Sequence, residues 1–298
     1  MIEIVNLTKT FQNKTALDNV NITVREGMIY GLVGSNGSGK STLLRLISGV
    51  YTPEEGTLTV DGHSVFNHPE IKAQICFLPD TPYFIHQANI NEMVKFYRLM
   101  YPTFNEQKFK HLTTVFPLDT KAKISTMSKG MQRQAALMLA LSTEPKYLLL
   151  DEAFDGLDPV MRKVLKSLLV DSIADGMTVI ISSHNLRDLD DFCDSVGLLH
   201  NGKILFSDEI DNLKSNIHKV QVVFDKIPDI NAFEGLDVLK SEKSGSVVQL
   251  VVRGEEKEIV EYINHLFPLF VEIIPPTFEE IFIYELEENG YDAKNILE

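Results

Sequence analysis

The hydrophobic pattern of the first 80 residues alternates between strand-like runs and one helical segment. Apolar and β-branched residues gather in short runs bounded by turn residues, which is typical of strands. These runs are Ile2–Val5, Val20–Val24, Met28–Val33 and Gly56–Asp61. Between the last two, apolar residues at helical spacing begin after Lys40 and stop at Gly49, which predicts a helix. Met28–Val33 is a continuous apolar run, so we expect a buried central strand there.

Helical spacing dominates the middle of the chain, and two further strand-like runs follow it. Apolar residues recur at three- and four-residue steps from about Ile90 to Ser142. Tyr147–Leu150 and Thr178–Ser182 are candidates for buried strands, and a helix from about Val160 to Ala174 joins them. Strand–helix–strand alternation predicts an α/β fold with a mostly parallel sheet and helices packed against it.

The pattern changes near Lys214. Beyond it, strand-like runs and two helical segments alternate without the motifs described below; they are Val220–Phe224, Val247–Val252, Glu255–Leu266, Phe270–Ile274 and Thr277–Glu287. Pro275 and Pro276 separate the last strand from the last helix. We therefore expect a main domain over 1–214 and a small α+β accessory region over 215–298.

The charge balance argues against one class of partner, although a basic patch confined to one face would escape it. Acidic residues outnumber basic ones 42 to 28 in the 298 residues, which gives a net charge of -14. Proteins that bind duplex nucleic acid normally carry a positive footprint, so we expect no nucleic-acid partner. No run approaches the ~20 apolar residues of a spanning helix, so we expect a soluble chain that reaches a membrane through a partner. Cys76 and Cys193 could pair, but two isolated cysteines are more often buried thiols, which is what we expect here.

The strongest chemical signal is the segment Gly34–Ser41, which fits the phosphate-loop pattern GxxxxGK[ST]. It follows a buried strand and opens a helix, as such a loop requires. The glycines allow backbone amides to point inward at phosphate oxygens, aided by the positive end of the helix. Lys40 is expected to reach the β- and γ-phosphates of a ligand, and the Ser41 hydroxyl to ligate Mg²⁺.

Two carboxylates follow the strand Tyr147–Leu150. Because strand ends meet at one edge of a parallel sheet, Asp151 and Glu152 are expected beside the phosphate loop. Asp151 would hold Mg²⁺, and Glu152 would polarise an attacking water. Taken alone, the pair could also be the N-cap of the next helix.

Two more segments contain candidate ligands. Ser128 and Gly130, in Met127–Met131, open a helix and could form an anion site, although Ser128 could also be a simple helix cap. His184 follows the strand Thr178–Ser182 and could hydrogen-bond a γ-phosphate; a lone histidine is more often structural.

Together these elements resemble, in order over residues 2–210, the nucleotide-binding subunit of ATP-binding cassette (ABC) transporters. The resemblance implies a P-loop NTPase core with an N-terminal antiparallel β subdomain and a helical subdomain at about 86–145. It makes Gly34–Ser41 the Walker A loop, Tyr147–Asp151 the Walker B strand, and 154–158 the D-loop. Glu152, His184 and Lys40 become the catalytic residues. Phe11, unless it is merely a buried hairpin residue, stacks on adenine.

The resemblance also implies a ligand set and a dimer. Residues expected to contact ATP are Phe11, Gly34, Ser35, Asn36, Gly37, Ser38, Gly39, Lys40, Ser41, Thr42, Ser128 and Gly130. Metal ligands would be Ser41, Asp151 and Asp80. In the family, two cassettes pack head to tail, so that the signature segment of one, with Ser128 and Gly130, closes the ATP site of the other.

This sequence departs from the family pattern at two places. Met127-Ser128-Lys129-Gly130-Met131 replaces the usual Leu-Ser-Gly-Gly-Gln signature and is similar to that of exporter ATPases whose membrane subunits are separate chains. Asp80 stands where the family has its Q-loop glutamine. The shorter, charged aspartate could approach the metal through water, or it could alter coupling and slow turnover.

The expected function is that of an ATPase subunit of an ABC exporter, peripheral on the cytoplasmic face of the membrane. Its partners would be an integral membrane subunit, docked near Asp80–Phe104 around Tyr83, Phe84 and Ile85, and a second cassette, identical or paralogous. Those three side chains could instead be ordinary packing of the lobe. A cassette ATPase of translation or DNA repair is the alternative. The accessory region could bind a regulator, stabilise the dimer or support the membrane partner.

Overall fold

The computed structural model describes residues 1–66, 68–225, 228 and 230–288. The chain forms two compact units, Met1–Ser207 and Asp208–Glu298, and each is described by itself. Residues 289–298 of the predicted accessory region lie outside the described residues. No described helix combines the length and the apolarity that crossing a bilayer requires.

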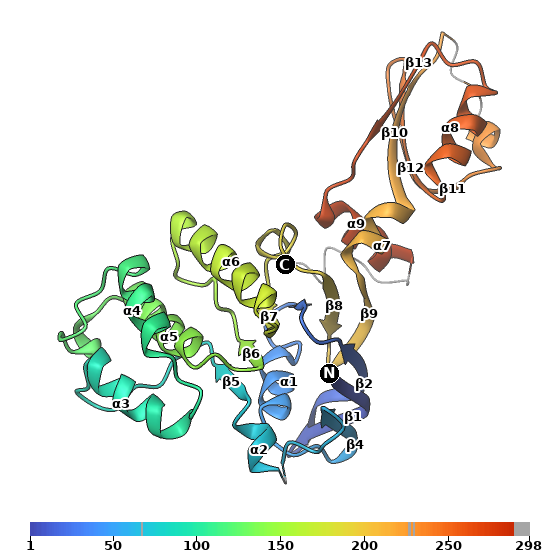
Figure 1. The fold of residues 1–298 in the computed structure, drawn as a ribbon. Coiled ribbons are helices and arrows are strands. Elements are labelled where there is room, and N and C mark those ends of the chain that lie inside the picture. The colour runs from blue at the N-terminus through green and yellow to red at the C-terminus, as the bar shows by residue number, and fades with distance from the viewer. Residues whose placement is uncertain (67, 226–227, 229, 289–298) are drawn as a thin grey trace. The chain divides into compact units, whose positions relative to one another are not determined.

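A six-stranded sheet in the order β5-β6-β7-β3-β8-β9 forms the centre of the first unit (Figure 1). Its strands are β3 (Ile29–Val33), β5 (Ile75–Leu78), β6 (Tyr147–Leu150), β7 (Thr178–Ser183), β8 (Ser195–His200) and β9 (Lys203–Glu209). Pairing is parallel from β5 through β8. Every residue of β3, β6 and β7 is buried, as a sheet covered on both faces requires. The predicted α/β class is confirmed.

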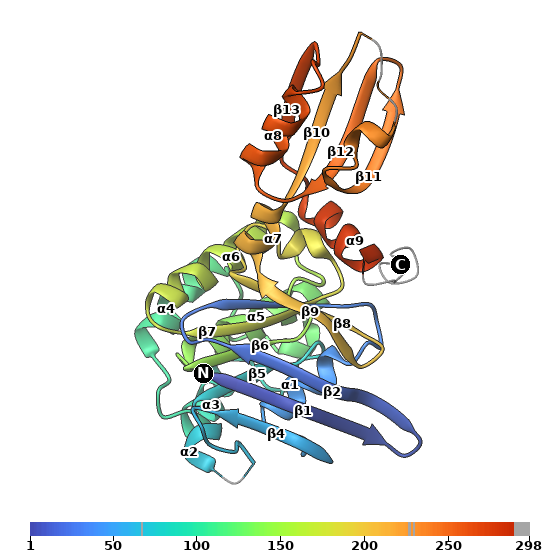
Figure 2. The same ribbon diagram turned by 90° about the vertical axis from the view of Figure 1, so that its right-hand side faces the viewer.

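An antiparallel sheet in the order β2-β1-β4 lies against the same core (Figure 2). Its strands are β1 (Ile2–Phe11), β2 (Lys14–Val24) and β4 (Glu55–Val60). Helix α1 (Lys40–Ile47) buries Leu43, Leu44, Leu46 and Ile47 in one cluster with inward residues of this sheet and with Tyr30 and Leu149 of the central sheet. The phosphate-loop helix is therefore held between two sheets.

Helices fill the segment between β5 and β6. They are α3 (Ile90–Met100), α4 (Glu106–Val115) and α5 (Lys129–Ser142), and α5 contacts both other helices and β5. Asn89 begins α3 with a capping box: its side chain accepts from Glu92 N, and Glu92 accepts from Asn89 N, both at 2.9 Å. Shorter elements are α2 (Pro69–Lys72) and the 3₁₀ turns Ile124–Thr126 and Leu186–Asp188, whereas α6 (Pro159–Ala174) joins β6 to β7.

The second unit is α+β, as predicted. An antiparallel sheet in the order β11-β12-β10-β13 contains β10 (Ile217–Val223), β11 (Asp237–Ser244), β12 (Val247–Arg253) and β13 (Phe270–Ile274). Helix α8 (Glu256–Asn264) packs Ile259 and Ile263 against Val220 and Leu250 of the sheet. The remaining helices are α7 (Ile210–Asn216) and α9 (Phe278–Glu288), with a 3₁₀ turn at Ile230–Phe233.

Several elements differ from the sequence prediction. Periodicity did not indicate β5, β8, β9, β11, α2 or α7. Strand β11 is mostly exposed and polar, so only its pairing with β12 makes it a strand. Along the chain, the boundary between the two units falls between Ser207 and Asp208, before the change of pattern predicted near Lys214. The reason is that α7 belongs to the second unit, where it contacts α9. Cys76 and Cys193 are free and buried, as expected.

A charged cluster ties β4 to β6 at the edge of the sheets remote from the phosphate loop. Asp61 accepts hydrogen bonds from Lys146 Nζ at 2.8 Å, from the Met1 amino group at 2.7 Å and from the Tyr147 hydroxyl at 2.5 Å. Partial burial raises the pKa of Asp61, but these hydrogen bonds outweigh it and hold the pKa well below its ordinary value. A lowered carboxyl pKa stabilises the fold at pH values above the unfolded-state pKa.

We expect Asp61→Asn to remove a pH-dependent part of the stability. In the wild type this part is fully present above about pH 4, the unfolded-state pKa of aspartate, and is lost as the pH falls through the lower folded-state pKa. The variant should unfold more easily by ~1–2 kcal/mol at pH 7, with the difference shrinking toward pH 2. Urea unfolding across this pH range measures it, with the exposed Asp171→Asn as control. A difference independent of pH would contradict the assigned role.

Candidate functional site

The loop between β3 and α1 is closed by short contacts that only glycine allows. Gly39 has φ +117°, a conformation that L side chains rarely adopt. A Cβ on Gly34 would lie 2.2 Å from the Leu199 carbonyl oxygen and 2.6 Å from Ser38 Oγ. Backbone bonds from Gly34 N to Ser183 O (3.3 Å) and from Gly202 N to Ser38 O (2.9 Å) hold the loop against β7 and the β8–β9 turn. The loop is therefore fixed by its neighbours.

Lys40 is the buried cation of this loop. Its side chain is 5% exposed, and its Nζ donates to the carbonyl oxygens of Gly34 (2.6 Å) and Ser35 (3.1 Å). The same Nζ lies 3.1 Å from Glu152 Oε1. The loop and the end of β6 are thus joined by one ammonium group.

Asp151 and Glu152, at the end of β6, have different partners. Asp151 is buried; its Oδ1 accepts from Ser182 Oγ at 2.8 Å, and its Oδ2 makes no hydrogen bond. Glu152 N donates to the same Ser182 Oγ at 3.0 Å. Glu152 has φ +49°, a left-handed conformation that is strained for a non-glycine residue and common at functional sites.

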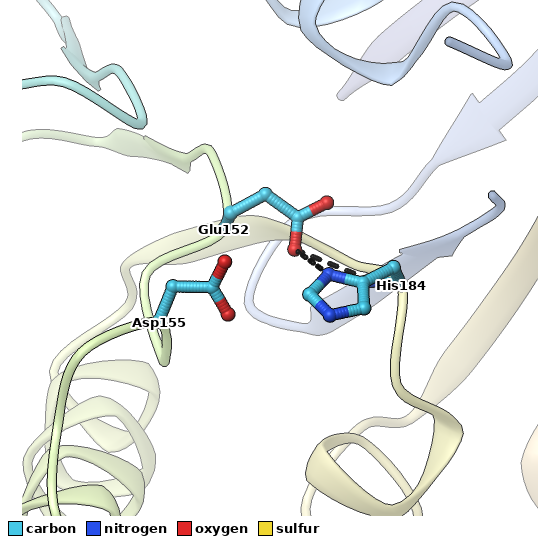
Figure 3. Close-up of side chains that lie close together, drawn as sticks. All are labelled: Glu152, Asp155 and His184. Atoms are coloured by element: carbon cyan, nitrogen blue, oxygen red, sulfur yellow. Dashed lines mark hydrogen bonds and ion pairs between the residues drawn. The ribbon is translucent and has the colours of Figure 1, made fainter. Parts of the chain in front are cut away.

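His184 completes a small polar cluster with Glu152 and Asp155 (Figure 3). Glu152 Oε2 lies 2.9 Å from His184 Nδ1 and accepts from His184 N at 3.2 Å. Burial, followed by the negative charge of Glu152, raises the pKa of Asp155. One ligand atom from each of the three residues lies within 4.8 Å of the others, so the cluster could hold a cation. Glu152 is already shared between Lys40 and His184.

A pocket of about 390 Å³ opens above the phosphate loop. Its lining combines residues from the β1–β2 hairpin, the loop, α1 and the ends of β5 and β6: Phe11, Lys14, Ala16, Asn36, Gly37, Gly39, Lys40, Ser41, Thr42, Asp80 and Glu152. Phe11 is exposed here and meets Tyr51 edge-to-face at 5.2 Å, so it is not a buried hairpin residue. Gly34, Ser35, Ser38 and Asp151 are not among the lining residues.

Ser128 and Gly130 do not line this pocket. Ser128 is exposed and is the N-cap of α5, because its Oγ accepts from Met131 N at 3.2 Å. The N-cap of α6 is Asp158, which accepts from Val160 N and Met161 N, so the helix-cap alternative for Asp151 and Glu152 is wrong.

Arg133 is a site residue that the sequence reasoning missed. It lies on α5, and its Nη2 donates to Asp80 Oδ1 at 2.9 Å. The sequence signal for Arg133 was a basic residue shortly after the segment Met127–Met131. Its pairing with Asp80 could not be seen in the sequence, because it needs β5 and α5 to be adjacent. Ser182 was missed for a similar reason, since only the β6–β7 pairing places it beside Asp151.

The fold and this site define a P-loop nucleoside triphosphatase: a parallel sheet, a glycine loop opening a helix, and carboxylates at the adjacent strand end. The ABC transporter family model matches residues 17–155. The ABC transporter ATP-binding protein YtrB of Bacillus subtilis (strain 168) is 30% identical over 285 residues, covering 95% of this chain and 97% of YtrB.

Two further proteins are similar. The bacitracin transport ATP-binding protein BcrA of Bacillus licheniformis is 30% identical over 226 residues, covering 74% of this chain and 73% of BcrA. A solved structure of an ATP binding subunit of an ABC transporter has a TM-score of 0.67 at 27% identity and covers 72% of this chain and 92% of that one. The chain therefore belongs to the ABC transporter ATP-binding proteins, and it is an ATPase of that type.

Proposed function

We propose that the pocket above the phosphate loop binds the magnesium complex of ATP. The amides of 34–42 and the Lys40 ammonium would bind the phosphates, and the exposed ring of Phe11 would stack on adenine. The donor set suits magnesium: Asp151 Oδ2 is buried without a hydrogen bond, and the hydroxyl of Ser41 and the carboxylate of Asp80 line the pocket. When bound, magnesium neutralises charge on the β- and γ-phosphates.

Glu152 is the proposed base for water attack. Its carboxylate is fixed by Lys40 on one oxygen and by His184 on the other, which supports a defined orientation toward the pocket. Lys40 would leave Glu152 for the γ-phosphate when ATP binds, freeing Oε1 to accept a proton from water. His184 would then hold the carboxylate and sense the phosphate. The Lys40–Glu152–His184 arrangement is the observation that carries this proposal.

A second cassette is proposed to complete the site. Ser128 and Gly130 carry the donors that a triphosphate needs on its open side, yet they lie outside the pocket of their own chain. A head-to-tail pair related by a two-fold axis would bring Ser128 of each chain to the other chain's ATP. The pair would close on ATP and reopen after hydrolysis, as a two-state switch biased by the ligand. The partner is a second copy or a paralogue.

The closing motion is proposed to drive export through a separate membrane subunit, with this chain peripheral on the cytoplasmic face. Tyr83 is 78% exposed and Ile85 is also exposed, whereas Phe84 is half-buried. Packing within the lobe therefore does not explain Tyr83 and Ile85, which could receive a helix of the partner. The name of BcrA refers to bacitracin transport, which favours a peptide antibiotic among the possible small-molecule or peptide cargoes. The acidity of the chain argues against a nucleic-acid partner.

We expect Glu152→Gln to keep ATP binding and lose turnover by at least ~100-fold, because the amide cannot accept the proton. ATP should then trap a dimer, visible by light scattering. Steady-state hydrolysis and the Kd for ATP measure the two effects, with the exposed Glu70→Gln as control. Turnover near the wild-type rate would remove Glu152 from the mechanism.

We expect Ser128→Arg to leave the ATP affinity of the monomer within ~2-fold of wild type, because Ser128 is outside its own pocket. The same change in the Glu152→Gln background should abolish the ATP-dependent dimer. Lys40→Ala is the contrasting variant, since it should weaken ATP binding to the monomer itself. If Ser128→Arg weakened monomer binding as strongly as Lys40→Ala, the two-chain site would be wrong.

We expect the tagged chain, purified from a detergent extract of its native membranes, to retain an integral membrane subunit. Replacing Tyr83 and Ile85 by serine should release that subunit while ATP binding by the isolated chain persists, because neither side chain lines the pocket. Mass spectrometry of the bound fraction measures this. Recovery with ribosomes or DNA-repair proteins would instead favour the alternative class of cassette ATPase.

A further inference from the structure

Arg133 and Asp80 form an ion pair between the helical segment and the rim of the ATP pocket. Arg133 is only 6% exposed, and its Nη2 donates to Asp80 Oδ1 at 2.9 Å. Its Nη1 donates to the Pro79 carbonyl oxygen at 3.3 Å. Both contacts belong to the segment that follows β5, so one guanidinium holds two successive residues of that segment.

The two partners of the ion pair differ in burial. The Asp80 side chain is 56% exposed, whereas the Arg133 side chain is 7% exposed. The guanidinium is buried, and a buried charge needs a partner. Asp80 also lines the pocket with Lys40 and Ser41. An unpaired carboxylate there would repel an anionic triphosphate, and Arg133 supplies the opposing charge.

The first turns of α5 contact two loops, the Pro79–Asp80 segment after β5 and the loop after β6 that contains Gly156. Arg133 contacts the Pro79–Asp80 segment, and one turn earlier Gly130 lies so close to the next loop that a Cβ would be 2.8 Å from the Gly156 carbonyl oxygen. The ion pair also acts on Asp155. The pKa of Asp155 is raised, mainly by burial and by the charge of Glu152; to a smaller extent the charge of Arg133 lowers this pKa and the charge of Asp80 raises it. The ion pair therefore lies within the electrostatic reach of the catalytic cluster.

We propose that Arg133 is a positioning residue that holds the Asp80 carboxylate at the mouth of the pocket as a magnesium ligand, and so links metal binding to the helix that carries Ser128. The inference rests on the proposed ATP site. In this proposal the negative charge of Asp80 contributes to magnesium binding, and Arg133 contributes only by holding Asp80 in place. Arg133 should therefore matter only while residue 80 is a carboxylate.

A double-mutant cycle tests this dependence. The probe is a fluorescent ATP analogue, and the measured quantity is the gain in its affinity when Mg²⁺ replaces EDTA. Arg133→Gln and Asp80→Asn should each reduce that gain by ~5–10-fold, and the double variant should lose no more than either alone. Arg133→Lys should keep part of the gain, because it retains the charge but loses the two-point contact.

The outcomes separate the inference from the proposed function. If Arg133→Gln reduced the Mg²⁺-dependent gain in affinity equally in the wild-type and Asp80→Asn backgrounds, the arginine would be purely structural and the inference would be overturned. An unchanged gain in the Arg133→Gln variant would also overturn it. A wild-type chain that binds the probe equally in Mg²⁺ and EDTA would overturn the proposed metal site itself. Lys219→Gln, which breaks the half-buried Lys219–Glu280 pair of the second unit, is the control and should leave the gain unchanged.

Discussion

The parallel register of β3, β6 and β7 is the constraint on which the site depends. Val33 pairs with Ser183, and Leu150 pairs with Ile181, so these strands end at one edge of the sheet. The residues that follow are Gly34, Asp151 and His184, each from a distant part of the chain. Buried backbone hydrogen bonds fix this register, because a shift would leave unpaired amides and expose apolar side chains. The residues of the site are thus placed by fully buried, hydrogen-bonded strands.

Charge balance is the second organising feature. Asp80 and Glu152 line the pocket above the phosphate loop, Asp151 and Asp155 lie next to Glu152, and two buried cations oppose these four carboxylates. Lys40 joins the phosphate loop to Glu152, and Arg133 joins α5 to Asp80. Each cation is shared between two structural elements, so a ligand that competes for it also changes how those elements are held together.

Unfavourable local features gather at the same edge. Glu152 has a left-handed backbone, and buried oxygens of Asp151 and Ser38 have no hydrogen-bond partner. Each such feature costs of order 1 kcal/mol or more. The surrounding apolar strands and α1 offset this cost, which leaves polar groups in the geometry that a phosphate or cation would satisfy.

Local pattern determined much of the fold, because burial on both faces makes β3 and β6 largely apolar and gives β7 an apolar centre at Val179–Ile181. Helical spacing likewise marks α1 and α6. The phosphate loop and the Asp151–Glu152 pair were also visible in sequence, since glycine positions and a strand end are local features. Tertiary structure alone decided the rest. Strand β11 exists through its partner, Ser182 meets Asp151 through strand pairing, and Arg133 meets Asp80 only because α5 packs on β5. Contacts between residues distant in sequence depend on how elements pack, and that information is spread over the whole core and not held in any one segment.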